Sequence, residues 1–174
     1  MMQMDVGAEI HDAEHRRERL YVSPSLGPEN SLSYWWKTVH PLRVMWNFIW
    51  IYLAKYSPSL ALKRVLLRRT GMRVGRAASI ALAVVFDIFY PEQIEIGDNS
   101  IIGYNSVVLA HEFMVEEWRK GPVFIGRNVS IGANVTILPG VIIGDGATIS
   151  SMSLVNKDIP PGEFWGGIPV RKLK

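Results

Sequence analysis

Residues 125–149 read IGRNVS IGANVT ILPGVI IGDGAT I, a run in which isoleucine returns at every sixth position. Earlier hexads begin at Ile96 and Ile102 and lead into Val108. A period of six fits neither one face of a helix with 3.6 residues per turn nor a long alternating strand. Short strands separated by bends do fit it, and such a repeat indicates a solenoid.

The positions within each hexad predict how the solenoid is built. The aliphatic first residue and the small fifth residue point inward, while asparagine or glycine at the fourth position suits left-handed backbone geometry. Glycine at the second position permits tight backbone conformations. Three short strands make one triangular coil, and the coils stack at a strand spacing of about 4.8 Å so that their backbones pair. We therefore expect a mainly β protein, a parallel β-helix over residues 73–174.

Residues 125–169 carry the most specific family signal: the hexads through Ile149, followed by SSMSLVNKDIPPGEFWGGIP. This stretch resembles the hexapeptide-repeat acyltransferases and is most similar to the maltose and galactoside O-acetyltransferase group and its uncharacterised relatives. The resemblance covers residues 74–174. It implies a left-handed parallel β-helix, a homotrimer with active sites at subunit interfaces, acetyl-CoA as acyl donor without a metal, and a histidine base at a break in the repeat.

His111 is the one histidine of the repeat region, and it stands where the hexads break. Its hexad begins at Val108, yet Glu112 takes the place of a small inward residue, and the repeat resumes at Ile125, one residue early. The chain therefore leaves the β-helix, and the excursion 112–124 resembles a protruding loop that helps form the substrate site in this family. The alternative is a histidine that only hydrogen-bonds at a loop entrance.

A histidine suits acyl transfer to a hydroxyl. An alcohol attacks a thioester poorly unless its proton is removed as the bond forms, and a neutral imidazole can take that proton and return it to the departing thiolate. No serine-histidine-acid motif is present, which favours direct transfer over an acyl-enzyme. Candidates to orient His111 are Asp87, Glu112 and a backbone carbonyl. Glu112 is the weaker carboxylate because adjacent residues on an extended segment face opposite ways.

Asp87 resembles an aspartate on the acceptor side of the sugar acetyltransferases, and we expect Asp87 and Glu112 to bind substrate. The alternative for Asp87 is a turn carboxylate. Where those enzymes carry asparagines ahead of the aspartate, residues 78–81 read ASIA, which disfavours a simple galactoside or maltose acceptor.

The resemblance also assigns a coenzyme side. It comprises two positions whose backbone contacts the pantetheine arm, two at the nucleotide end, and two basic positions that approach phosphates. In that order they are Ala133 and Ser151, Asn156 and Lys157, and Arg171 and Lys174. The usual Gly-Ala-Gly-Ser is replaced by SSMS at residues 150–153, so Met152 either narrows the groove or faces solvent.

The chain before the repeats is organised differently. Residues 1–30 are polar and predict a mobile segment; they contain no secretory signal, which favours a cytoplasmic protein. Residues 31–72 are apolar and basic and predict two helices, one over 42–54 and one over 60–69 that begins after Ser57 and Pro58. These helices either cap the β-helix or, through residues 35–55, contact a membrane surface peripherally.

Composition narrows the function classes. The 174 residues include no cysteine, which excludes disulfides and a cysteine nucleophile. A net charge of +3 is compatible with coenzyme phosphates but lacks the dense basic stripe of a nucleic-acid binder. A zinc enzyme of the γ-type carbonic anhydrase class needs three histidines, and the repeats hold only His111. We expect an O-acetyltransferase for a sugar or glycan-related hydroxyl; the alternatives are a membrane-associated, lipid-linked acceptor and a non-catalytic trimeric scaffold.

Overall fold

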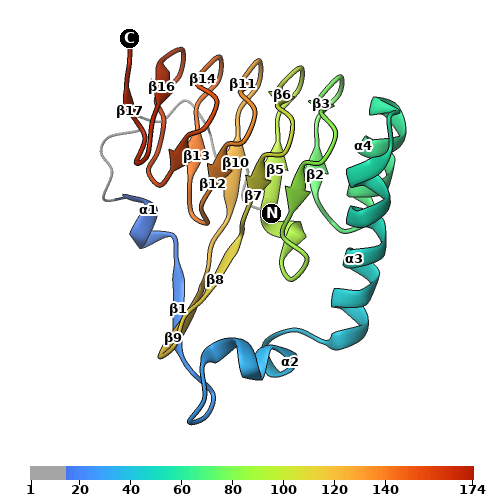
Figure 1. Ribbon diagram of the computed structural model, residues 1–174, viewed down its shortest axis with the longest axis vertical. Coiled ribbons are helices and arrows are strands. Elements are labelled where there is room, and N and C mark those ends of the chain that lie inside the picture. Colours follow the sequence, from blue (N-terminus) through green and yellow to red (C-terminus); the bar gives the residue numbers. More distant parts are fainter. Residues whose placement is uncertain (1–14) are drawn as a thin grey trace.

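The computed structural model describes residues 15–174, and three parallel sheets dominate it (Figure 1). The chain visits the sheets in turn, so neighbouring strands of one sheet come from successive coils. The first sheet holds β2 (Arg73–Val74), β5 (Ile94–Ile96), β10 (Val123–Ile125) and β13 (Ile142–Ile143). The second holds β3 (Ser79–Ile80), β6 (Ile101–Ile102), β11 (Ser130–Ile131), β14 (Thr148–Ile149) and β16 (Phe164–Gly166), with β17 (Arg171–Lys172) antiparallel to β16. The third holds β4 (Val85–Phe86), β7 (Val107–Val108), β12 (Thr136–Ile137) and β15 (Leu154–Val155).

The mainly β class expected from the hexads is confirmed, and the hexad starts form the core. In the first sheet Ile125 pairs with Ile96 on one side and with Ile143 on the other, and all three are buried. Small polar residues also point inward. Ser100 is fully buried, where its hydroxyl donates to the Gly126 carbonyl and accepts from the Val129 N–H of the next coil. Aliphatic ladders and hydroxyl bridges together join each coil to its neighbour.

The corners between strands follow from the other two hexad positions. Asn99 and Asn128 have φ near 57° and 56°, and the Asn99 amide donates to the Asn128 side-chain oxygen at 2.8 Å. The second-position glycines serve close stacking, because a Cβ on Gly97 would lie 2.5 Å from the Gly126 carbonyl carbon of the next coil. Asparagine thus supplies the left-handed corner, and glycine lets the coils approach.

The excursion of residues 112–124 is a β-hairpin that projects from the coils (Figure 1). Strands β8 (His111–Phe113) and β9 (Glu117–Lys120) pair antiparallel, and β1 (Tyr21–Pro24) adds a third strand along β9. Trp118 lies opposite Phe113 in the hairpin and is buried, and its ring stacks on Tyr90 at 6.1 Å between centroids. The break in the hexads therefore creates a small antiparallel sheet outside the solenoid.

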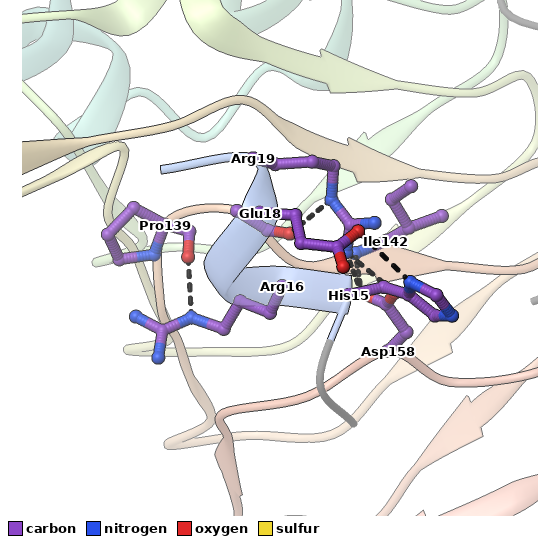
Figure 2. Close-up of polar contacts among 8 residues, drawn as sticks. His15, Arg16, Glu18, Arg19, Pro139, Ile142 and Asp158 are labelled. Carbon is purple, nitrogen blue, oxygen red and sulfur yellow. Dashed lines mark hydrogen bonds and ion pairs between the residues drawn. The ribbon is translucent and has the colours of Figure 1, made fainter. Parts of the chain in front are cut away.

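Residues 15–30, part of the segment whose polarity predicts mobility, contact the β-helix, while residues 1–14 lie outside the described residues. Helix α1 (His15–Glu18) crosses the coil corner at Pro139 (Figure 2). The Arg16 Nε donates to the Pro139 carbonyl, and Arg19 donates to both carboxylate oxygens of buried Asp158 at 2.6 Å. Arginine hydrogen bonds to partners more than 120 residues away, one a backbone carbonyl and one a carboxylate, hold this segment on the β-helix. Local composition does not reveal such partners.

Four helical segments connect β1 to the first coil: η1 (Ser31–Tyr34), α2 (Trp35–Thr38), α3 (Pro41–Tyr56) and α4 (Leu60–Arg68); η2 (Pro91–Gln93) lies later, between coils. Helix α4 begins at Ser59, whose hydroxyl accepts from the Leu62 N–H, rather than at Ser57. Gly71 follows it with φ 92°. No helix within residues 15–174 combines the length and the apolar character that crossing a membrane requires.

Helix α4 covers the open edge of the first coil. In later coils the carbonyls of Ile96 and Ser100 accept from the preceding coil, but their equivalents in the first coil, Val74 and Ala78, have no coil before them. Side chains of α4 donate instead: Arg68 to Val74, Arg64 to Ala78 and Lys63 to Ala81. Burial lowers the pKa of the Lys63 ammonium. Capping by α4 thus satisfies backbone groups that a solenoid end would otherwise leave unpaired.

Candidate active site

His111 and Asp87 meet at one corner of the β-helix. Strands β4 and β7 are neighbours in the third sheet with Phe86 opposite Val108, so the residues that follow them leave the sheet side by side. The Asp87 N–H donates to the Val108 carbonyl at 3.0 Å. The His111 Nδ1 contacts the Asp87 Oδ2 directly. Of the three candidates to orient the histidine, the structure selects Asp87.

The Asp87 carboxylate is fully buried and held by four hydrogen bonds. Oδ1 accepts from the backbone N–H groups of Phe89 and Tyr90 at 2.8 and 3.0 Å, and Oδ2 accepts from the Ala110 N–H at 2.8 Å and pairs with His111. Asp87 therefore closes a turn and orients the imidazole at once. An ionised carboxylate only accepts hydrogen bonds, so in the neutral imidazole this contact favours the tautomer with the proton on Nδ1 and the lone pair on Nε2.

Aromatic rings surround the imidazole, and the sequence analysis did not single them out. The centroids of Phe89 and Phe113 lie 4.7 and 4.8 Å from that of His111, both edge-on, and Tyr90 lies at 6.0 Å. Burial raises the pKa of the Tyr90 phenol. The available signal was the run FDIFYP at residues 86–91, which is aromatic on both sides of the candidate aspartate. These rings narrow water access to the imidazole, whose side chain is 14% exposed.

Glu112 and Lys120 flank this corner in different ways. The Glu112 carboxylate accepts from Arg16 at 3.0 Å, away from the imidazole, and burial of that pair lowers the pKa of the Arg16 guanidinium against the opposing effect of Glu112. Lys120 pairs with His111 across the hairpin, and its ammonium lies over the Tyr90 ring at 4.8 Å. Among residues 15–174 it forms no ion pair with a carboxylate, and its ammonium also lies over the Tyr21 and Trp118 rings.

Four of the six coenzyme-side positions fall into two separate groups. Ala133 and Ser151 stack on each other at one coil corner, where the Ala133 N–H donates to the Ser151 hydroxyl at 3.1 Å. Met152 next to them is 61% exposed with φ 59° and faces solvent. The second group follows β15. There, Asn156 has a buried side-chain oxygen with no donor among the described residues, and the Lys157 ammonium lies 6.0 Å from the Trp165 ring centroid.

The remaining two basic positions lie at the end of the chain. Arg171 begins β17 opposite Gly166, and the Lys174 N–H donates to the Phe164 carbonyl. Lys172, between them, forms the ion pair of this strand with Glu163. Arg171 and Lys174 are exposed at the surface and form no ion pair with an acidic residue among the described residues. Residues 15–174 also contain no cluster of three histidine or acidic side chains that could hold a metal ion.

Known proteins share this sequence and fold. The family model described as bacterial transferase hexapeptide (six repeats) matches residues 122–157. The Bacillus subtilis (strain 168) protein named "Putative acetyltransferase YvoF" is 52% identical over 143 residues, which span 82% of this chain and 83% of that protein. The chain belongs to the hexapeptide-repeat acetyltransferases. It is an acyltransferase by this membership.

Three further comparisons concern a sugar acetyltransferase and two solved structures of this fold. Galactoside O-acetyltransferase of Escherichia coli (strain K12) is 37% identical over 114 residues, which span 60% of this chain and 54% of that enzyme. A solved galactoside acetyltransferase in complex with coenzyme A aligns with a TM-score of 0.62 and 29% identity, covering 77% of this chain and 80% of that one. The hexapeptide-repeat acetyltransferase VCA0836 from Vibrio cholerae shares the fold with a TM-score of 0.66 at 24% identity, covering 76% of this chain and 90% of that one.

Proposed function

We propose that this acetyltransferase moves the acetyl group of acetyl-CoA to a hydroxyl of a sugar or glycan-related acceptor, with His111 as general base. The observation that carries the proposal is the His111–Asp87 pair, in which a buried, fully hydrogen-bonded carboxylate holds Nδ1 and leaves Nε2 without a hydrogen bond within the described residues. An imidazole held in this tautomer is ready to accept a proton.

The proposed reaction is a direct transfer. The acceptor oxygen attacks the thioester carbonyl carbon while Nε2 takes the hydroxyl proton. The tetrahedral intermediate then collapses, the carbon–sulfur bond breaks, and the imidazolium returns the proton to the coenzyme A thiolate. The Lys120 ammonium on the same side of the hairpin supplies positive charge for the developing oxyanion.

One structural observation supports coenzyme A as the ligand of the residues assigned to the acyl donor. The Asn156 side-chain oxygen is buried without a donor, and a buried orphan acceptor is costly unless a ligand or a partner supplies an N–H. Coenzyme A carries such donors in its pantetheine amides and its adenine amino group. Lys157 beside it, with Arg171 and Lys174 at the chain end, would meet the phosphates. Ala133 and Ser151 would line the pantetheine arm.

The proposed assembly is a homotrimer of left-handed β-helices with acetyl-CoA in the groove between neighbours. Family membership supports both points. In a cyclic trimer each groove is equivalent, so three identical active sites form, and each can combine residues of two subunits.

A second acceptor class is favoured by the rings around His111. Phe89, Tyr90 and Phe113 present apolar surface to whatever hydroxyl approaches Nε2, whereas residues 78–81 lack the asparagines of the simple-sugar enzymes. Such walls suit an acceptor that joins a hydroxyl to an apolar group, as a lipid-linked glycan does.

The test measures acetyl-CoA binding by calorimetry and acetyl transfer by release of free thiol. His111→Ala should retain binding while turnover falls by about 10²- to 10⁴-fold. Lys157→Ala should weaken binding, and Lys37→Ala, an exposed lysine on α2, is the matched control that should not. Absence of acetyl-CoA binding by the wild type would reject the proposal and favour the non-catalytic scaffold.

A further inference from the structure

Helix α3 is apolar on two opposite sides. One side is buried through Val44, Ile51 and Ala54, together with Asn47, whose amide donates to the Ile88 carbonyl; the four recur at three- and four-residue spacing. The other side shows large apolar residues at the same spacing, all between 44% and 74% exposed. We call these residues the α3 outer face: Leu42, Met45, Trp46, Ile49, Tyr52, Leu53 and Tyr56. A helix that only caps a solenoid needs the first side and not the second.

The outer face is continuous rather than scattered. Along one flank the rings of Phe48, Tyr52 and Tyr56 succeed one another with centroids 5.6 and 5.1 Å apart. On the other flank Trp46 packs edge-on against Trp50 at 5.3 Å. In Figure 1, α3 and α4 form one edge of the molecule beyond β2 and β3. An exposed apolar surface of this extent marks an interaction site.

The segment that carries the outer face contributes charges of one sign, and one of its cations, Arg43, pairs with Glu92 from outside the segment. Residues 31–72 contain seven of the 19 lysines and arginines of the chain and none of its 16 acidic residues. Three of these cations lie over aromatic rings at the border: Lys37 over Tyr34, Lys55 over Tyr56 and Arg69 over Trp50. None of the three pairs with a carboxylate within residues 15–174.

We propose that the α3 outer face docks on an anionic phospholipid surface. A helix of 16 residues, about 24 Å long, can lie in the membrane plane with its aliphatic residues among the acyl chains. Trp46 and the tyrosines suit the headgroup level, and the bordering cations attract anionic headgroups. A partner must be apolar opposite the centre of the face and anionic opposite its border. A phospholipid surface combines both, whereas a protein surface of average composition does not. The proposal stands apart from the acceptor proposed above, since docking requires neither acetyl-CoA nor catalysis.

The first test is co-sedimentation of the full-length protein with phosphatidylcholine vesicles, with and without phosphatidylglycerol. We expect the wild type to bind the vesicles that contain phosphatidylglycerol and to release them at high salt. The double variant Ile49→Asp/Leu53→Asp should bind at least about tenfold more weakly. Leu26→Asp, which changes a 42%-exposed leucine elsewhere on the surface, is the matched control and should bind like the wild type.

The second test separates charge from apolar contact. Lys37→Gln and Lys55→Gln should each weaken binding to phosphatidylglycerol vesicles by about fivefold, the contribution of one cation near an anionic surface. Melting temperatures of all variants are the control for folding. We expect them to match the wild type because every substituted residue is on the surface. Wild-type protein that binds neither vesicle overturns the proposal. So does an Ile49→Asp/Leu53→Asp variant whose oligomer mass drops while its vesicle binding is unchanged, because the face is then a contact between copies of this chain.

Acetyl-CoA titration of the same samples keeps the two proposals distinct. Vesicle binding without acetyl-CoA binding overturns the proposed function and supports docking. Acetyl-CoA binding by a wild type that ignores both vesicles does the reverse.

Discussion

Replacement of Asp87 by asparagine tests the orientation of His111 most directly. The carboxylate accepts four hydrogen bonds, from Phe89, Tyr90, Ala110 and His111. In Asp87→Asn the amide oxygen can keep the Phe89 and Tyr90 N–H groups, but the NH₂ then faces the Ala110 N–H and the ring Nδ1. The imidazole escapes this conflict by moving its proton to Nε2, which removes the lone pair that acts as base.

The magnitudes follow from that count. Loss of the base should lower acetyl transfer by about 10²- to 10⁴-fold, while the dissociation constant of acetyl-CoA stays unchanged. One buried backbone donor, the Ala110 N–H, loses its partner, so the free energy of unfolding should fall by about 1–3 kcal/mol. Turnover at saturating acetyl-CoA, calorimetry and denaturant unfolding measure the three quantities. The control is Asp98→Asn, an exposed carboxylate that also accepts a backbone N–H, from Arg76 at 2.6 Å.

Asp87→Asn protein that folds and turns over at the wild-type rate would refute the reasoning, because His111 would then act without its orienting carboxylate. A loss of acetyl-CoA affinity in place of turnover would refute it too, by moving Asp87 to the donor side.

Three further predictions concern stability. Ile137→Ala, at a fully buried ladder position, should cost about 2–5 kcal/mol in urea unfolding, whereas Ile101→Ala, half exposed, should cost under about 1 kcal/mol; equal losses would contradict the inward ladder. Arg19→Met strands the buried Asp158 charge and should cost about 3 kcal/mol, with no change expected if α1 were detached from the coils. Burial lowers the pKa of Lys63, so the unfolded state binds its proton more tightly. Wild-type stability relative to Lys63→Met should therefore rise as pH climbs toward lysine's ordinary pKa, and a falling difference between melts at about pH 7 and about pH 10 would contradict this assignment.

The solenoid could be predicted because its rule is local. A six-residue period places an aliphatic residue on every short strand, and identical strands stack with their equivalents in the next coil, as Ile125 does between Ile96 and Ile143. A break in a regular six-residue period is also visible in the sequence, so the residue at which the period fails could be identified directly. His111 stands there, at the entrance to the hairpin.

The partners of His111 could not be read in this way. Asp87 lies 24 residues earlier, and only the register of β4 with β7 brings the two side chains together. Before the register is known, Glu112 is the nearer carboxylate along the chain, yet the strand turns it toward Arg16. The rings of Phe89 and Phe113 converge on the imidazole for the same reason, from a loop and from a hairpin that the sequence leaves unrelated.

The amino-acid sequence by itself determined the coil, its core residues and the point where the chain leaves it, because hexad periodicity is a short-range property. Tertiary structure alone decided the rest. It holds residues 15–30 on the β-helix through Arg19 and Asp158, which are 139 residues apart. It also divides α3 into a side that is buried and a side that is exposed. Both outcomes depend on which surfaces meet after the coils have stacked, and burial, not composition, distinguishes an apolar residue that caps from one that remains exposed.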